Sequence, residues 1–156
     1  MLQEIPAEHA VEDLIRASRI FVAIAAGSLA GDGEQQLSIQ QYRALALLAT
    51  RESQRPADLA RSLGVTPSTT TALCDRLVEK GMISRQRGTD RRSISLVVSA
   101  RGRELLKKIA ERRGDLLRDI LLRLPSPTQA QLVEALLAFT EAAGDVNIDE
   151  WSIRGL

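Results

Sequence analysis

The sequence predicts a mainly α-helical fold that carries one short β-hairpin, and three observations support this fold class. Apolar residues recur at helical spacing in long segments at both ends of the chain. Capping residues, glycines and prolines divide the middle into shorter helices. Only around residues 82–98 does strand-like alternation replace the helical period. The chain has 156 residues, of which 3% are aromatic, so we expect one domain with an aliphatic core.

The first two helices are predicted at residues 11–29 and 39–50. The first ends in a glycine-containing segment at residues 27–33, and its apolar stripe consists of Val11, Leu14, Ile15, Ser18, Val22, Ala25 and Leu29. Ser38 is the predicted N-cap of the second helix, and Gln41 completes a capping box. The second helix is nearly all apolar in its last two turns, so we expect it to be buried.

Two shorter helices follow, joined by the turn Gly64-Val65-Thr66. Pro56 suits the first turn of the first helix, although Arg55 before it is a poor capping residue. Thr66-Pro67 is a strong start signal for the second helix, which ends at residues 80–81. The pattern is therefore helix, tight turn, helix.

A β-hairpin is predicted next, with strands at residues 82–87 and 93–98 and a polar turn at residues 88–92. In the second strand one side is expected to be buried and the other exposed, because Ile94, Leu96 and Val98 alternate with Ser93, Ser95 and Val97.

The C-terminal part predicts two more amphipathic helices. Ser99 is the expected cap of a long helix that runs to Leu124. Ser126 is the expected cap of the last helix, Gln129 completes its capping box, and Gly144 ends it. The apolar stripe of the last helix consists of Leu132, Val133, Leu136, Leu137 and Thr140.

Charge is distributed unevenly along the chain, although the formal net charge is only +1. Residues 1–50 hold three basic and six acidic side chains, residues 51–113 hold fifteen and seven, and residues 114–156 hold three and seven. The central segment therefore carries a net +8 between two acidic ends. A basic centre of this kind matches a surface for nucleic-acid phosphates, and no basic amphipathic segment outside it favours a membrane.

Composition and motifs argue against a secreted protein, a membrane protein and an enzyme. The one cysteine cannot form an internal disulfide, and the acidic N-terminal segment lacks the basic region of a signal peptide. The apolar run at residues 20–26 is far shorter than the ~20 residues of a membrane span. The single histidine is accompanied by no Ser/His/Asp set, metal-ligand spacing or phosphate-binding loop. We expect a cytoplasmic protein without enzymatic activity, metal or cofactor.

The helix at residues 67–80 has two different faces. One is predicted to lie on the core and carries Thr70, Leu73, Cys74, Leu77 and Val78. The other offers short polar side chains and one long arginine, and carries Ser68, Thr69, Ala72, Asp75 and Arg76. Such a face suits base edges and phosphates in the major groove, so we predict DNA contacts from Ser68, Thr69, Thr71, Ala72 and Arg76. The alternatives are ordinary helix-start hydrogen bonds for Ser68 and Thr69 and a surface ion pair between Arg76 and Glu79.

The polar turn forms the basic tip of the predicted hairpin, a wing beside the two helices. Arg91 and Arg92 can reach the minor groove, whose negative potential attracts guanidinium groups. Asp90 cannot bind DNA itself, and we expect it to orient Arg92 by a charge-assisted hydrogen bond. A solvated turn is the alternative.

These motifs resemble the multiple-antibiotic-resistance regulator (MarR) family of winged helix-turn-helix transcription factors. The wing pattern of the family appears here as Asp90, Arg92, Leu96, Val98, Ser99 and Gly102. The segment LARSLGVTPSTTTALCDRLVEKGMISR is similar to the two-helix motif and the strand that follows it. The resemblance covers nearly the whole chain, including Gln41-Tyr42. One departure is Ala72, where many members carry a long polar side chain.

The resemblance implies a homodimeric repressor on a pseudo-palindromic operator, with recognition helices about one DNA turn, ~34 Å, apart. It implies a single domain over residues 1–156, with a DNA-binding lobe at 37–99, dimerisation helices at 8–31 and 100–144, and a tail at 145–156. The apolar stripes of the terminal helices support a dimer independently, since one small winged domain cannot cover them.

The resemblance also implies a small aromatic or anionic effector that binds where the dimer helices meet the lobe and releases the DNA. Phe21 and Tyr42 are candidate pocket residues, although core packing explains them equally well. One alternative is a thiol-responsive repressor acting through Cys74, yet a thiol on a core face is usually inert. Another is a winged-helix protein-interaction module without DNA binding, against which the three arginines of the helix and the wing argue.

Overall fold

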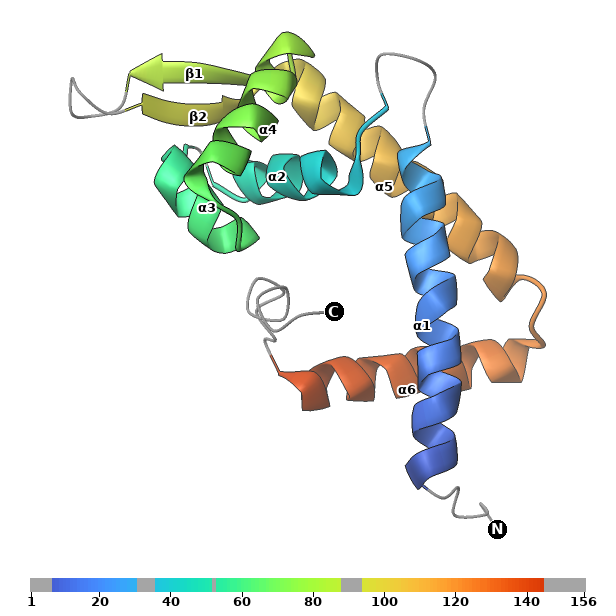
Figure 1. The fold of residues 1–156 in the computed structure, drawn as a ribbon. Coiled ribbons are helices and arrows are strands. Elements are labelled where there is room, and N and C mark those ends of the chain that lie inside the picture. The colour runs from blue at the N-terminus through green and yellow to red at the C-terminus, as the bar shows by residue number, and fades with distance from the viewer. Residues whose placement is uncertain (1–6, 31–35, 52, 88–93, 145–156) are drawn as a thin grey trace.

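The computed structural model describes residues 7–30, 36–51, 53–87 and 94–144 (Figure 1). Within these ranges the elements are α1 (Ala7–Leu29), α2 (Ile39–Ala49), α3 (Pro56–Leu63), α4 (Pro67–Glu79), β1 (Ile83–Arg87), β2 (Ile94–Val98), α5 (Ala100–Leu121) and α6 (Ser126–Ala143). The predicted mainly α-helical fold with one short hairpin is confirmed. The predicted wing tip, with Asp90, Arg91 and Arg92, and the tail lie outside the described residues.

The described elements form two regions. Helices α2 to α4 and the two strands pack together, and we call them the lobe. Helices α1 and α5 lie side by side and extend away from the lobe, with α6 at the far end of α5; we call these three helices the base (Figure 1). None of the helices described has both the length and the apolar character that crossing a membrane requires.

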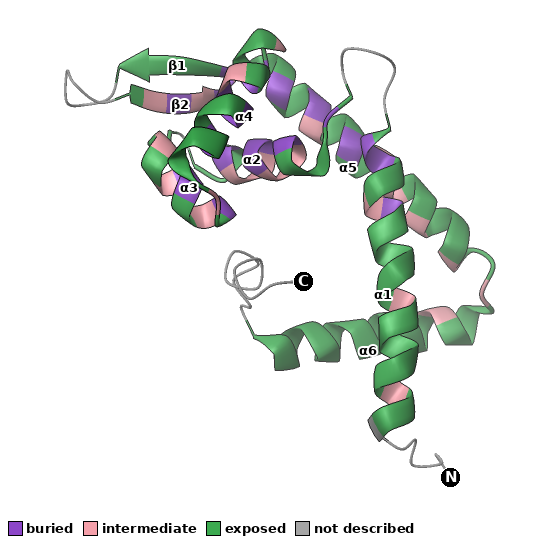
Figure 2. Ribbon diagram, in the orientation of Figure 1, coloured by how far each residue is buried: buried purple, intermediate pink, exposed green. Residues whose placement is uncertain are grey.

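The hydrophobic core lies in the lobe and under the first half of α5 (Figure 2). Its most enclosed side chains include Leu45, Leu48, Leu59, Leu77, Met82, Leu96 and Ile109. Each side chain of this size stabilises the fold by roughly 1.5–3 kcal/mol when it leaves water. Helix α6 has no buried residue, so it adds almost nothing to this core.

The strands form an antiparallel pair in which Ile83 lies opposite Val98. A third segment joins them, because Gln54 and Leu96 exchange backbone hydrogen bonds of 3.1 and 2.8 Å. The buried Gln54 side chain also donates to the Leu47 carbonyl at 2.9 Å. Sequence reasoning missed this contact, since a single bridge leaves no alternating pattern.

Local hydrogen bonds determine where the helices begin and end. Ser38 Oγ accepts from the Gln41 N–H at 3.2 Å, and the Gln41 side chain accepts from the Ser38 N–H at 3.0 Å, so the predicted capping box is confirmed. Thr66 Oγ1 accepts from the Thr69 N–H at 3.2 Å at the start of α4. Gly64 ends α3 with a φ of 65°, a left-handed conformation that glycine adopts without strain.

The predictions for the connection between α5 and α6 are wrong in three respects. Helix α5 ends at Leu121 rather than Leu124. Pro125, not Ser126, is the N-cap of α6, and it makes no side-chain capping bond. Gln129 Nε2 donates to the Leu124 carbonyl at 2.9 Å instead of completing a capping box. Helix α6 thus starts at Ser126, one residue earlier than predicted. The Gln129 side chain stabilises the turn before the helix instead of its first turn.

Candidate nucleic-acid interface

Helix α4 has the buried and exposed faces that its sequence predicts. Thr70, Leu73, Cys74 and Leu77 are buried. Val78 is 36% exposed, contrary to prediction, because it lies at the edge of the buried face of the helix rather than at its centre. The exposed residues include the whole predicted contact set, Ser68, Thr69, Thr71, Ala72 and Arg76. This side of α4 is therefore open to a ligand.

The hydroxyl groups at the start of α4 have defined partners. The Ser68 and Thr69 hydroxyl oxygens each lie 2.9 Å from Thr66 Oγ1. Thr71 Oγ1 donates to the Pro67 carbonyl at 2.9 Å. The helix-start hydrogen bonds that the sequence offered as an alternative are thus present. They hold exposed hydroxyls in set directions, so they are compatible with a contact to DNA.

Arg76 is exposed on the last two turns of α4. Among the described residues it forms no ion pair, neither with Glu79 nor with another carboxylate. A guanidinium has five N–H donors and suits phosphate oxygens or the acceptor edge of guanine. The alternative of an ion pair with Glu79 is therefore not supported.

Asp75 is joined to the hairpin. Arg85 Nη2 on β1 lies 2.6 Å from Asp75 Oδ1, and the two side chains are 40% and 47% exposed, respectively. Sequence reasoning placed Asp75 on the outer face of α4 and missed Arg85. The two residues belong to different elements on either side of the Gly81 turn, so no local spacing signals the pair.

The outer half of the hairpin is polar and exposed on β1. Arg87 is exposed and pairs in register with Ile94. Ile94 is 52% exposed and contradicts its predicted inward position, because the strand has passed the edge of the core there. Asp90, Arg91 and Arg92 lie beyond this pair, outside the described residues, so their roles stay predictions.

Cys74 lies in the core of the lobe with 1% of its surface exposed. Burial raises the pKa of its thiol; Arg85 opposes this shift and Asp75 adds to it. Since the thiolate is the reactive form, a raised pKa makes the sulfur less reactive near neutral pH. The geometry argues against a thiol-responsive switch at Cys74.

The two predicted effector residues have different surroundings. Phe21 on α1 is 48% exposed. Tyr42 packs against the lobe core, and the Arg113 guanidinium of α5 lies 5.3 Å from its ring centroid, a cation–π distance. Arg113 also donates from Nη2 to the buried Ser28 Oγ at 3.4 Å, and its buried Nε has no hydrogen-bond partner among the described residues. Sequence reasoning missed Arg113, which adds a cation beside Tyr42 where the lobe meets the base.

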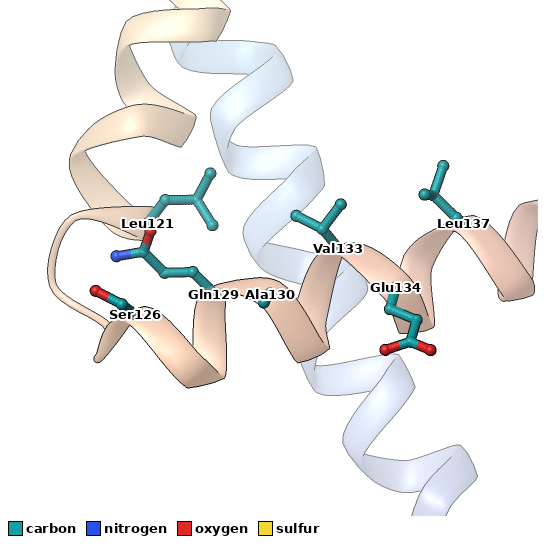
Figure 3. A pocket seen from close by; sticks show the side chains of 7 residues that line it. All are labelled: Leu121, Ser126, Gln129, Ala130, Val133, Glu134 and Leu137. Carbon is teal, nitrogen blue, oxygen red and sulfur yellow. The ribbon is translucent and has the colours of Figure 1, made fainter.

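A separate hollow lies between the end of α5 and α6 (Figure 3). It has a volume of about 570 Å³ and is lined by Leu121, Ser126, Gln129, Ala130, Val133, Glu134 and Leu137. Figure 3 shows Val133 and Leu137 on one side of α6 and Glu134 on another. Neither predicted effector residue lines this hollow.

The base exposes large apolar side chains on all three of its helices. They are Val11, Leu14, Ile15, Ile20, Phe21 and Val22 on α1, Leu116 and Ile120 on α5, and Leu132, Val133, Leu136, Leu137 and Phe139 on α6. Monomeric soluble proteins rarely leave apolar surface of this extent in water.

Comparison with known proteins finds a family model that matches the lobe and a relative that matches about three fifths of the chain. A model described as the MarR family matches residues 37–94. The HTH-type transcriptional regulator YfiV of Bacillus subtilis is 31% identical over 98 residues, which are 62% of this chain. The aligned part spans 61% of the length of that relative.

Solved structures share the fold. RV1404 from Mycobacterium tuberculosis is 35% identical with a TM-score of 0.82, and the match covers 93% of this chain and 99% of that chain. A mutant of S. aureus MepR bound to an oligodeoxyribonucleotide has a TM-score of 0.68 at 18% identity, covering 85% of this chain and 96% of that chain.

Proposed function

The chain belongs to the MarR family of winged helix-turn-helix transcription factors, and from this we propose that it is a sequence-specific DNA-binding regulator. In this proposal it is a cytoplasmic homodimer without catalytic activity. It represses transcription from a pseudo-palindromic operator until a small aromatic or anionic effector releases it.

The exposed face of α4 carries this proposal. The Ser68 N–H lies at the positive end of the helix and suits a phosphate, whereas the Thr69 N–H is already donated to the Thr66 cap. The hydroxyls beside them and the exposed Arg76 suit base edges and phosphates. Ala72 between them offers a methyl group, which can contact only an apolar group such as the thymine methyl. The DNA-bound MepR mutant supports DNA binding as a use of this fold.

The apolar surface of the base supports the homodimer. A two-fold axis places the same patch of both copies face to face, so each copy covers the exposed apolar side chains of the other. The two α4 helices would then contact successive turns of one DNA face, about 34 Å apart.

Tyr42 and Arg113 support an anionic aromatic effector. Tyr42 belongs to the lobe and Arg113 to the base, so a ligand held by both favours one arrangement of the two regions. In calorimetric titrations with a panel of aromatic acids, beginning with benzoate, we expect a member that binds and that loses affinity in Arg113→Ala. The same acid must weaken DNA binding. Binding by no member of the panel would count against this part of the proposal.

The DNA-binding claim is tested by fluorescence anisotropy with the DNA upstream of the chain's own gene and non-specific competitor. We expect saturable binding that resists the competitor. Arg76→Ala should weaken it by about tenfold, which corresponds to the loss of a charge-assisted contact. The matched control is Arg123→Ala, which removes the same charge just beyond the end of α5, far from the lobe, and should bind as the wild type does. Weak, competitor-sensitive binding alone, or equal losses in both variants, would contradict the proposal.

A further inference from the structure

Asp75 presents an electrostatic difficulty for a DNA-reading helix. It lies one turn after Thr71 and Ala72 on the same side of α4, because residues three and four apart are helix neighbours. Its side chain is 47% exposed, so the carboxylate is not hidden from a bound duplex. Alone, this negative charge would repel phosphates within the screening distance of roughly 10 Å.

The structure gives the carboxylate a partner on the hairpin. Arg85 Nη2 donates to Asp75 Oδ1 at 2.6 Å, a short charge-assisted hydrogen bond. Side chains alternate along a strand, so Arg85 shares the side of β1 that carries the buried Ile83. This contact joins α4 to β1, the first strand of the hairpin. Arg87 lies two residues further along the same side of that strand.

Within the described part of the chain, Arg85 keeps donors for a further acceptor. Its guanidinium has five N–H donors, of which this contact with Asp75 uses one, and the side chain is still 40% exposed. A free arginine loses much of its rotamer freedom when it binds a phosphate, whereas one already held by a carboxylate loses less. The pair therefore offers an oriented cation between α4 and the wing.

We propose that Asp75 is a positioning residue that holds the Arg85 guanidinium in place to bind a DNA phosphate. The inference rests on the proposed function and adds Arg85 to its contacts. If Asp75 positions Arg85, removing its negative charge weakens DNA binding. If Asp75 only repels phosphates, removing the charge strengthens DNA binding.

The chain supplies a matched control for this sign. Asp75→Asn and Glu79→Gln each remove one negative charge from the same helix at nearly constant side-chain volume, and Glu79 is exposed one turn beyond Asp75. Affinities are measured by anisotropy on the upstream DNA over a range of salt concentrations. We expect Glu79→Gln to bind more tightly than the wild type, and Asp75→Asn to bind roughly fivefold more weakly, the value of a well-oriented exposed pair.

Arg85→Gln tests whether Asp75 acts through Arg85. Loss of the phosphate contact should reduce the slope of log affinity against log salt by about 0.9 for each bound protomer. With Arg85→Gln already present, Asp75→Asn should tighten binding, because the carboxylate then has no arginine left to hold. This reversal of sign between the two backgrounds measures the coupling. Thermal unfolding of each variant is followed in parallel, since a merely structural pair shifts the melting temperature and leaves the salt slope unchanged.

Two results would overturn the inference while leaving the proposed function intact. One is an Asp75→Asn variant that binds as tightly as Glu79→Gln; the other is an Arg85→Gln variant with the salt slope of the wild type. Absence of saturable binding by the wild-type protein is a different outcome, because it removes the proposed function itself.

Discussion

The lobe encloses most of its large apolar side chains, whereas the base leaves many of its own exposed. In the lobe, Leu45 and Leu77 are fully enclosed, and polar side chains cover the outside of α4. In the base, α6 has no buried residue and Leu137 is 65% exposed (Figure 2). A high exposed fraction therefore means something different in each region. Exposed polar groups on the closely packed lobe are available to a ligand, whereas exposed apolar groups on the base, and above all on α6, require a second surface to cover them.

The largest effect is expected from a substitution on α6, which should disrupt the dimer. Leu136→Asp places a charge in the middle of the apolar side, and an unpaired charge at a closed interface is strongly destabilising. We expect the wild type to sediment as a dimer and Leu136→Asp as a monomer in analytical ultracentrifugation.

Ala138→Asp is the matched control for this substitution, because it adds the same charge about 200° around the same helix. It should leave the dimer intact. A wild-type monomer, or two variants that behave alike, would show that the apolar face of the base is not the interface.

Two glycines of α5 sharpen the comparison, one where the helix packs on the lobe and one in the half that extends away from it. A Cβ at Gly102 would lie 2.3 Å from the Met82 carbonyl oxygen and 2.9 Å from Val98 Cγ1, whereas a Cβ at Gly114 meets nothing within 4 Å. Gly102→Ala should therefore destabilise the protein by about 1–3 kcal/mol through overpacking. Gly114→Ala should stabilise it by roughly 0.5–1 kcal/mol through helix propensity.

Denaturant unfolding of the two variants checks these signs. A neutral Gly102→Ala would contradict the close packing of α5 on the hairpin. A destabilising Gly114→Ala would mean that a partner occupies the open side of α5.

The smallest expected effect concerns Cys74 in the core of the lobe. Its folded-state pKa is raised by burial above the unfolded value of about 8.5, so the folded state binds more protons between those two values. The contribution to stability is full below pH ~8 and is lost as the pH rises through the folded pKa, by at most ~1.4 kcal/mol per pH unit.

Comparison of the wild type with Cys74→Ser isolates this loss from other titrations. The unfolding free energy of the wild type should fall more steeply than that of the variant above pH ~8.5. Parallel curves up to pH ~10 would mean that the thiol titrates as freely as in the unfolded chain.

Sequence reasoning succeeded where neighbouring residues decide the structure. The Ser38 and Gln41 capping box, the Thr66 cap and the two faces of α4 depend on spacings of three and four residues, which the chain displays directly. It failed at Ser126, because Ser126 is itself the first helical residue and Pro125 before it takes the capping position. Two adjacent start signals cannot be ranked by pattern alone.

The candidate site was predicted only in part for a related reason. The exposed residues of α4 follow from its helical period, but the partners of Asp75 and Tyr42 come from other elements. Arg85 and Arg113 are two of many arginines in a basic segment, and only the packing of α4 on β1 and of α2 on α5 selects them. Tertiary pairs of this kind leave no periodic trace in the sequence.

Hydroxyl-radical footprinting of the bound upstream DNA tests the central claim most directly, because it reports the lobe and the base together. Two α4 helices carried by one dimer should protect two segments on the same face of the duplex, with centres about 10 base pairs apart. Leu136→Asp should abolish the paired footprint at the same protein concentration. A single protected segment, or a paired footprint that persists in the monomeric variant, would contradict the account.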